Sequence, residues 1–404
     1  MPINVDKWAD LAGEVSKVYE EAEMTMMRNI SNRVYADPYS ARWAEKKYSE
    51  MQDVNRSMQA FVGKLTSDRQ DIQSRLVNMA YGESGKAFLN EAHEFGQLAG
   101  ITHLTPNATK VINILTDLER RMDAADRNIL RAANDAYANI VGRASALVAT
   151  GTVTVREAVQ REINDFANRG ITSFVDVAGR HWDMETYSEM ATLTAIERAT
   201  LEGYTDAMEE FGFDLAEISS HFGACPVCEA WEGVIVSVTG ETHGYPTLDD
   251  AENAGVFHPR CLHDISTYYD GISRPGRTTP REVKEPNIGY AARSDQRHFE
   301  RMERAWKRRM AVAATPEEER KAYAHVRMYQ GRITDLLQSY NSQMDSEVDK
   351  LYRKRWREGP QVTLSKAAAK LPPYQIPEGW QAKPVNMAEL EAETSPNPEL
   401  PLPF

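Results

Sequence analysis

The chain has 404 residues, 42% of them hydrophobic and 26% charged, which is enough to bury a full core and to form two or three compact units. The three cysteines are an odd number, which argues against a disulfide framework and favours a reducing compartment. No stretch approaches the roughly 18 apolar residues that span a bilayer, and residues 1–7 lack the features of a signal peptide. We therefore expect a protein that is made and kept in a cytosol, away from membranes.

The net charge of -13 argues against simple non-specific binding to nucleic acid, but this charge is unevenly distributed. The segment from Arg274 to Glu358 contains 20 basic and 13 acidic residues, whereas the rest of the chain contains 27 basic and 47 acidic residues. The chain is therefore electrically polarised.

Long helices are predicted in the first third of the chain, because apolar residues recur there at three- and four-residue steps. One stripe runs from Trp8 to Ile30, a second from Met51 to Met79, and a third from Val111 to Ile140, with Pro106 as a start signal. Stripes this long and narrow favour a bundle over a compact enzyme domain. We assign residues 1–150 to a long-helix bundle or coiled-coil region.

The next unit, residues 151–273, is predicted to begin with two capped helices. Thr154 and Glu157 form a capping box for a helix that ends at Gly170, and Asp183 can cap a second helix that continues to about Gly212. From residue 221 to 270 the sequence changes to turns and short strands, with a β-rich segment at 234–238.

Metal-ligand residues gather in this non-helical part. All three cysteines and four of the nine histidines lie between positions 221 and 263. The Cys225-Pro-Val-Cys228 turn can place two thiolates on one ion, and the segment His258-Pro-Arg-Cys261-Leu-His263 can return two more ligands. Zinc prefers such sulfur and nitrogen ligands, and a unit this small gains most from a metal. We predict a structural zinc site at Cys225, Cys228, Cys261 and His263, with His258 as the alternative fourth ligand. The alternative interpretation is a pair of reduced, half-buried thiols beside an ordinary turn histidine.

Catalytic motifs are absent from the sequence. A catalytic zinc would need an open coordination position and a fixed acid or base, and nothing in the sequence fixes Glu229 or Asp264 over a substrate. The segment from Gly82 to Ala87 has the wrong spacing for a phosphate loop, and we interpret it as a helix-breaking loop. We therefore expect no enzymatic activity.

Residues 274–358 are predicted to form a basic helical hairpin. Thr315 and Pro316 mark the start of its second helix, whose apolar spacing extends to Leu351. We predict that two clusters of basic residues on the hairpin face DNA or another acidic surface. The alternative is that they are ordinary solvated helix faces. The two clusters are Arg301, Arg304, Lys307, Arg308 and Arg309, and Arg353, Lys354, Arg355 and Arg357.

The final segment, residues 359–404, contains nine of the 19 prolines and cannot form a core. We expect an extended, proline-rich arm that is ordered only on a partner. Its separated apolar residues would be the anchors: Tyr374, Ile376, Trp380, Leu390, Leu400, Leu402 and Phe404.

One segment, Arg156 to Tyr269, resembles the minor capsid and Mu F-like head morphogenesis proteins of tailed bacteriophages. The similarity lies in the order of a capped helix, an Ala178-Gly179-Arg180 turn, a second helix, the sequence from His221 to Gly233, and the sequence from His258 to His263. Family members often end the last motif with two cysteines one residue apart, and here His263 stands at the second position.

The resemblance implies a structural virion protein, present in several copies inside the head near the portal and assembled in the host bacterial cytoplasm. Its partners would be the portal protein, other head proteins and packaged DNA, and its role would be head assembly, DNA packaging or DNA delivery. Two alternatives remain: a phage-borne enzyme or toxin that carries a head-protein module, and a zinc-containing DNA-binding protein. The expected fold is mainly α, with long helices and helical hairpins around a small α+β Cys/His knuckle and an extended C-terminal tail.

Overall fold

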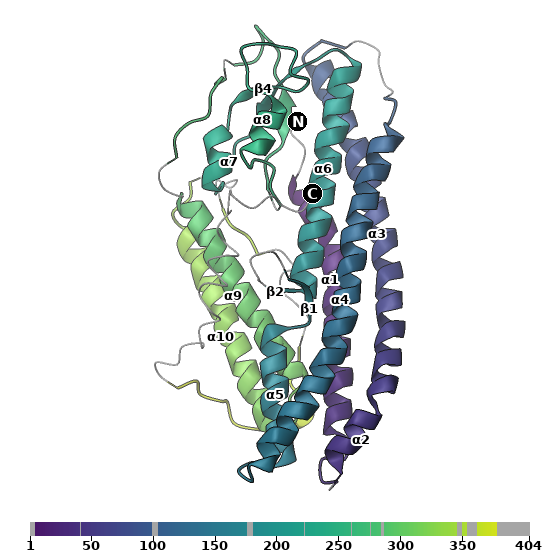
Figure 1. Cartoon of the computed structure of the whole chain (residues 1–404). Coiled ribbons are helices and arrows are strands. Elements are labelled where there is room, and N and C mark those ends of the chain that lie inside the picture. The colour runs from purple at the N-terminus through teal and green to yellow at the C-terminus, as the bar shows by residue number, and fades with distance from the viewer. Residues whose placement is uncertain are drawn as a thin grey trace.

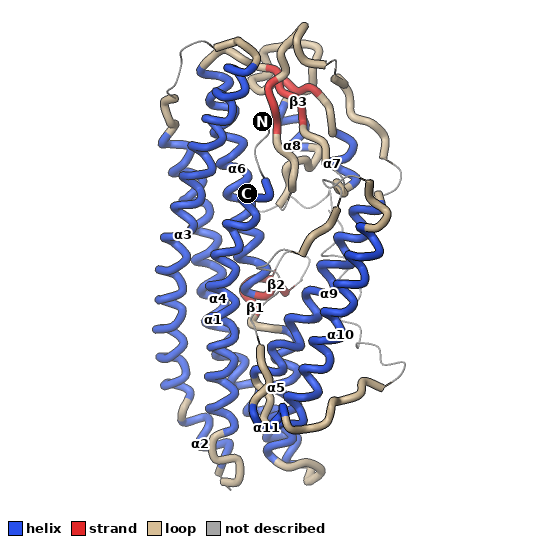
Figure 2. Tube along the Cα trace, turned by 180° about the vertical axis from the view of Figure 1, so that it is seen from behind, coloured by secondary structure: helices blue, strands red, loops and turns tan. Residues whose placement is uncertain are grey.

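The computed structural model describes residues 5–40, 42–98, 104–175, 181–221, 223–259, 261–274, 276–283, 287–345, 350–353 and 362–377. The molecule is elongated, because its long helices run along one common direction (Figure 1). A small unit of strands and short helices sits at one end of these helices, and a helical hairpin lies along their side (Figures 1 and 2). The expected mainly α fold is thus confirmed. None of the described helices is both long enough and apolar enough to span a membrane.

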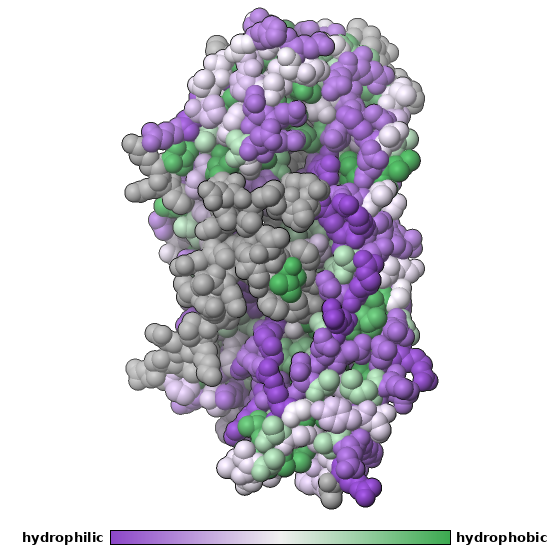
Figure 3. Space-filling model, viewed as in Figure 1, coloured by the Kyte–Doolittle hydropathy of each residue, from purple (hydrophilic) through white to green (hydrophobic). Residues whose placement is uncertain are grey.

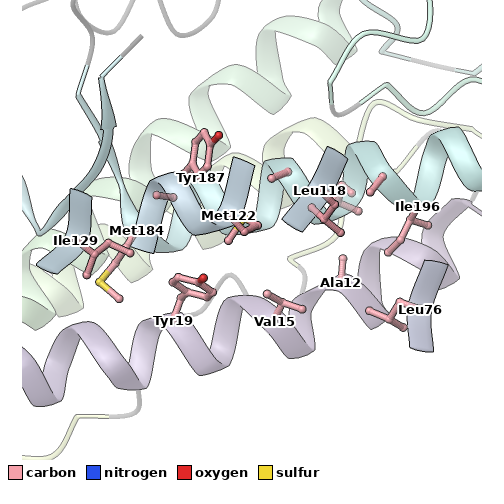
Figure 4. Packing of buried hydrophobic residues seen from close by; sticks show 14 of the residues in the cluster. Ala12, Val15, Tyr19, Leu76, Leu118, Met122, Ile129, Met184, Tyr187 and Ile196 are labelled. Carbon is pink, nitrogen blue, oxygen red and sulfur yellow. The ribbon is translucent and has the colours of Figure 1, made fainter. Parts of the chain in front are cut away.

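Four long helices form the central bundle: α1 (Val5–Tyr35), α3 (Met51–Glu94), α4 (Ala108–Ala149) and α6 (Met184–Glu210). The short helix α2 (Trp43–Ser49) lies between α1 and α3 in the chain. At 1.5 Å per residue, the 44 residues of α3 extend over about 66 Å. The predicted apolar stripes form the core, where Val15 of α1, Met122 of α4 and Ile196 of α6 point toward one another (Figure 4). Helix α6 belongs to this bundle although it lies beyond residue 150, where the first unit was predicted to end.

The predicted helix break at Gly82–Gly85 is wrong, because α3 runs through it without interruption. The two glycine-containing segments of α3 and α6 approach each other closely here. A Cβ atom placed on Gly203 would lie 2.3 Å from the carbonyl oxygen of Tyr81 and 2.5 Å from Oγ of Ser84. Glycine is required at this crossing because any side chain would push the two backbones apart.

A buried polar layer crosses the middle of the bundle. Arg69 is fully buried, and its guanidinium binds Asp126 at 2.9 Å, Asp123 at 2.6 Å and Glu119 at 3.2 Å. Tyr19 of α1 donates a hydrogen bond to Asp126 at 2.9 Å. These directional contacts tie α1, α3 and α4 at one axial position, which favours a single register.

The two helix starts predicted for residues 151–273 are confirmed. Thr154 and Glu157 form the capping box of α5 (Val155–Arg169), and Asp183 accepts a hydrogen bond from the Thr186 amide at the start of α6. Between them, β1 (Thr172–Val175) pairs antiparallel with β2 (His181–Asp183).

A three-stranded antiparallel sheet, in the order β4-β3-β5, follows α6 and lies at one end of the bundle (Figure 2). Its strands are β3 (Leu215–Ile218), β4 (Ile235–Ser237) and β5 (Ile265–Thr267), and two short helices accompany it, α7 (Pro226–Trp231) and α8 (Leu248–Asn253). The strand predicted at 234–238 is therefore confirmed. The Thr267 amide donates a hydrogen bond to Glu91 of α3 at 3.0 Å, which joins the sheet to the bundle.

The predicted hairpin is formed by α9 (Ile288–Ala311) and α10 (Pro316–Asn341), with Thr315 as the confirmed cap of α10. It has an apolar core of its own that includes Trp306, Val326 and Tyr329. The expected extension of the second helix to Leu351 is wrong. The side chain of Asn341 donates to the Leu351 carbonyl and accepts from the Leu351 amide, so the chain folds back at this point.

Three members of the first basic cluster point into the protein instead of toward DNA. Arg304, Lys307 and Arg308 are 8%, 2% and 6% exposed, and they form ion pairs with Glu185, Glu303 and Glu23, respectively. The prediction of a DNA-facing surface is wrong for these three residues, because acidic side chains of α1, α6 and α9 already neutralise them.

The remaining basic residues have mixed positions. The guanidinium of Arg309 lies 4.2 Å from the ring centroid of Trp306, Arg353 pairs with Glu303, and Arg301 is half-buried. Three members of the second cluster, Lys354, Arg355 and Arg357, lie outside the described residues.

Residues 362–377 of the predicted arm pack against the hairpin. The backbone amide and hydroxyl of Ser365 both donate to Glu319 of α10 at 2.6 Å, and Ala368 of α11 (Lys366–Ala369) is fully buried. The expectation that the arm is ordered only on a partner is wrong for this segment, because its own chain supplies the contacts. Trp380, Leu390, Leu400, Leu402 and Phe404 lie outside the described residues.

The described surface is largely polar. Hydrophilic residues cover most of the described face in Figure 3, and hydrophobic ones are scattered among them. Exposed large hydrophobic side chains such as Tyr39, Ile112 and Ile272 come from well-separated parts of the chain. Single apolar residues of this kind are normal on a protein surface.

Candidate metal centre

The predicted ligands come together in what we call the knuckle, residues 221 and 223–259 together with 261–264. Cys225 caps α7, and its sulfur accepts a hydrogen bond from the Cys228 amide at 3.5 Å. Pro226 at the first helical position fixes the start of this six-residue helix. On the facing turn, the Cys261 amide donates to the His258 carbonyl at 2.8 Å. Two tight turns therefore bring the sulfur of Cys228 close to the sulfurs of Cys225 and Cys261.

Three cysteines and two histidines form two overlapping groups that share Cys228. The ligand atoms of Cys225, Cys228 and His258 lie within 4.8 Å of one another, and so do those of Cys228, Cys261 and His263. The sulfurs of Cys228 and Cys261 are 3.7 Å apart. Sulfur–nitrogen separations are 3.1 Å from Cys225 to Nε2 of His258 and 3.3 Å from Cys261 to Nδ1 of His263. The structure thus keeps both predicted candidates for the fourth ligand beside the sulfurs.

Each histidine is oriented by its other ring nitrogen. Nδ1 of His258 lies 3.0 Å from the Pro259 carbonyl oxygen, and Nε2 of His263 lies 3.3 Å from a Glu232 carboxylate oxygen. Metal-binding histidines usually show this arrangement, because a hydrogen bond at one nitrogen leaves the other free to bind the ion. Glu232 was not predicted from the sequence.

The charges of the cluster are strongly coupled. Burial lowers the pKa of His258, but its hydrogen bond to Cys225 and nearby thiolate charge raise the pKa to about 9. Burial likewise lowers the pKa of His263, but its hydrogen bonds to Cys261 and Glu232 raise the pKa to about 9.

Among the sulfurs, the hydrogen bond from Cys228, followed by the one from His258, lowers the pKa of Cys225 to about 4, against the effect of burial. Hydrogen bonds to Cys225 and Cys261 raise the pKa of Cys228. Because the buried sulfur of Cys228 lies beside those of Cys225 and Cys261, the three do not all ionise without a cation among them.

Glu229 and Asp264, the two acidic residues considered for catalysis, form hydrogen bonds with neighbouring parts of the fold. Glu229 binds Arg281 at 2.8 Å and accepts a hydrogen bond from Asn287, the cap of α9, at 3.0 Å. The backbone amide of Asp264 donates a hydrogen bond to Oγ of Ser219. Burial raises the pKa of the Asp264 carboxyl to about 6. His243 is exposed on a separate loop. The arrangement therefore suits the joining of two turns better than catalysis.

Comparison with known proteins gives the broader assignment. Residues 3–338 match the family described as phage minor capsid protein 2. The chain belongs to this family. The match includes the bundle, the knuckle and nearly the whole hairpin, so the resemblance that the sequence showed between Arg156 and Tyr269 is confirmed and extended in both directions.

One relative of this minor capsid protein is described as a structural protein of Lactococcus phage LL-H. The two are 28% identical over 219 residues, which is 50% of this chain and 57% of the relative. The matched region thus spans little more than half the length of that relative. No solved structure matches the chain.

Proposed function

We propose that this phage structural protein lies inside the head near the portal, where it acts in head assembly and in the packaging or delivery of DNA. The observation that carries the proposal is the family match over residues 3–338. It is supported by the resemblance of residues 156–269 to Mu F-like head morphogenesis proteins, which implies a portal-proximal position and the portal as a partner.

The proposed role is mechanical and not catalytic. A bundle whose two longest helices, α3 and α4, extend over about 60 Å and are joined by the Arg69 layer is suited to fixing the distance between two attachment points in an assembly. The family match runs through the bundle and the knuckle and into α10, which supports a structural role over the toxin or enzyme that the sequence left as an alternative. Of the two predicted basic clusters, Arg301, Arg309, Arg353 and the members outside the described ranges remain for contact with packaged DNA, because Arg304, Lys307 and Arg308 are buried.

A comparison of heads assembled with and without the portal tests this function. Heads are purified from cells infected with wild-type phage and with a phage whose portal gene carries a nonsense mutation. The protein is then measured by quantitative mass spectrometry relative to the major capsid protein. We expect a few copies in wild-type heads and a loss of most of them without the portal. Undiminished incorporation would contradict portal association and would indicate attachment to the capsid shell.

A further inference from the structure

We propose that the knuckle is a structural zinc centre in which Cys225, Cys228, Cys261 and His263 hold one ion, and that this ion also fixes the start of the α9–α10 hairpin. This site is independent of the portal association proposed above. It concerns how the protein itself is held together.

The sulfurs of Cys228 and Cys261 have the spacing of two zinc ligands, the Cys225 sulfur lies beside that of Cys228, and all three are buried. Zinc–sulfur bonds of about 2.3 Å in a tetrahedron place neighbouring sulfurs about 3.8 Å apart, and the sulfurs of Cys228 and Cys261 are 3.7 Å apart. Cys225, Cys228 and Cys261 are 8%, 1% and 4% exposed, and all three are free thiols. A divalent cation that replaces their protons allows all three to be thiolates in this buried place.

His263 is the better fourth ligand of the two histidines. Its side chain is only 1% exposed. Its Nε2 is hydrogen-bonded to the carboxylate of Glu232, so its Nδ1 is directed at the sulfurs. His258 is more exposed, at the rim beside Cys225. A tetrahedral ion with three thiolates has one position left. We assign that position to His263, and we assign to His258 a hydrogen bond to the Cys225 sulfur.

The helices and strands around the two ligand turns are short. Helices α7 and α8 have six residues each, and the three strands have three or four. Elements this short contribute little stability by themselves. Cys225 and Cys228 are 33 positions from His258 and Cys261, respectively, so one ion would close a long loop of chain.

Contacts from α7 and the residue after it continue to the hairpin. Arg281 binds Glu229 at 2.8 Å and Glu232 at 3.5 Å, and the Asn287 side chain bonds to Glu229 and to the Ala224 carbonyl. Asn287 is also the cap of α9, where it accepts a hydrogen bond from the Tyr290 amide at 2.9 Å. Because Glu232 orients His263 on the other side, the ion, α7 and the first turn of α9 form one connected unit.

Metal content of the purified full-length protein tests the proposal. Elemental analysis should find one zinc per chain in the wild type. His263→Ala and Cys228→Ser should lose most of the zinc, whereas His258→Ala and the matched control His243→Ala, which removes an exposed histidine, should keep it. Circular dichroism of each variant verifies that the bundle helices are intact, so that loss of metal is separated from loss of fold.

Hydrogen exchange tests the coupling to the hairpin. Removing zinc from the wild type with a chelator should increase amide exchange in residues 225–237 and in the first turns of α9 by at least tenfold, and should leave α4 unchanged. Wild-type protein without zinc, or with two zinc ions per chain, would overturn the site. Retention of zinc in His263→Ala together with its loss in His258→Ala would overturn the assignment of the fourth ligand. Unchanged exchange in α9 would overturn the link to the hairpin.

Discussion

Arg308 joins the hairpin to the bundle, and replacing it with methionine should be among the most destabilising changes on α9. Its guanidinium lies 3.4 Å from Glu23 of α1 and donates to the carbonyls of Ala167 and Asn168, at the end of α5, at 2.9 Å and 3.3 Å. Arg308 and Glu23 are 6% and 2% exposed. Methionine keeps much of the arginine's apolar stem and removes only the charge and the hydrogen bonds.

The size of the effect follows from what is left behind. Without Arg308, the buried Glu23 carboxylate keeps the Ile171 amide as a donor at 2.7 Å and the charge of Arg304 nearby, but it loses its ion-pair partner. Removing one partner of a buried ion pair typically costs about 3–5 kcal/mol, and we expect a loss of this size at pH 7.5. The loss should be smaller at pH 5, because burial already raises the pKa of Glu23 and protonation would remove the unpaired charge. Adding Glu23→Gln to Arg308→Met should restore more than half of the lost stability.

Urea denaturation of the full-length protein measures these differences, with Arg120→Met as the matched control. Arg120 forms a shorter ion pair, 2.6 Å from Asp117, but its side chain is 71% exposed. Exposed pairs contribute about 0–1 kcal/mol, so the control should lose little stability. If Arg308→Met costs no more than Arg120→Met, burial does not strengthen this pair and the reasoning is refuted.

Three further predictions concern other parts of the molecule. Gly203→Ala should lower the free energy of unfolding by about 1–3 kcal/mol or more, because the new Cβ would lie 2.3 Å from the Tyr81 carbonyl oxygen. The control Gly63→Ala should be neutral or stabilising, because a Cβ there meets nothing within 4 Å. Equal unfolding midpoints in urea for the two variants would contradict this. Burial raises the pKa of Glu20 to about 7, although Arg304 and Lys307 oppose the shift, so its contribution to stability is present below its ordinary pKa and is lost as pH rises through about 7. Glu20→Gln should therefore be more stable than the wild type at pH 8 by up to about 3 kcal/mol and show no such advantage at pH 4, and a pH-independent difference would refute the argument. Removal of residues 359–404 should increase hydrogen exchange in the first turns of α10, since Glu319 loses both hydrogen bonds from Ser365, while the distant helix α4 serves as the unaffected control.

Local signals in the sequence predicted the helix starts well. Thr154, Asp183 and Thr315 cap their helices as expected, because a cap depends on a side chain and amides only two or three positions away. The continuation of α3 through Gly82–Gly85 could not be predicted in this way, since Gly85 lies against Leu104 and against Gly203 of α6, which comes more than a hundred residues later. The end of α10 was misjudged because Met344 and Leu351 keep a helical spacing after the helix has ended.

The candidate metal ligands could be predicted because their signal is chemical and not structural. Every cysteine lies in one short region with returning histidines, and the fold only has to bring two turns together. Glu232 was missed, because a single glutamate near a tryptophan has no distinguishing pattern. Its relation to His263, 31 positions later, arises only from the packing of α7 against the second ligand turn.

The basic cluster on α9 was misinterpreted because charge in a sequence does not reveal its partner. The polarity of the chain, basic in the hairpin and acidic elsewhere, reflects in part an internal pairing of Arg304 and Arg308 with Glu185 and Glu23. The hairpin holds its own two helices together through an apolar core, and it meets the bundle through Val312 and through buried charges and backbone carbonyls. Apolar contacts respond weakly to protons, whereas a buried carboxylate with a raised pKa responds directly. Glu20 of α1, which interacts with Arg304 and Lys307 of the hairpin, has a pKa raised to about 7 by burial, so the attachment of the hairpin should weaken before the bundle unfolds as the pH rises through about 7. Hydrogen exchange of α9 and α4 followed in parallel from pH 6 to pH 8, after correction for intrinsic exchange rates, measures this difference, and equal changes in both helices would show that the two parts unfold as one unit.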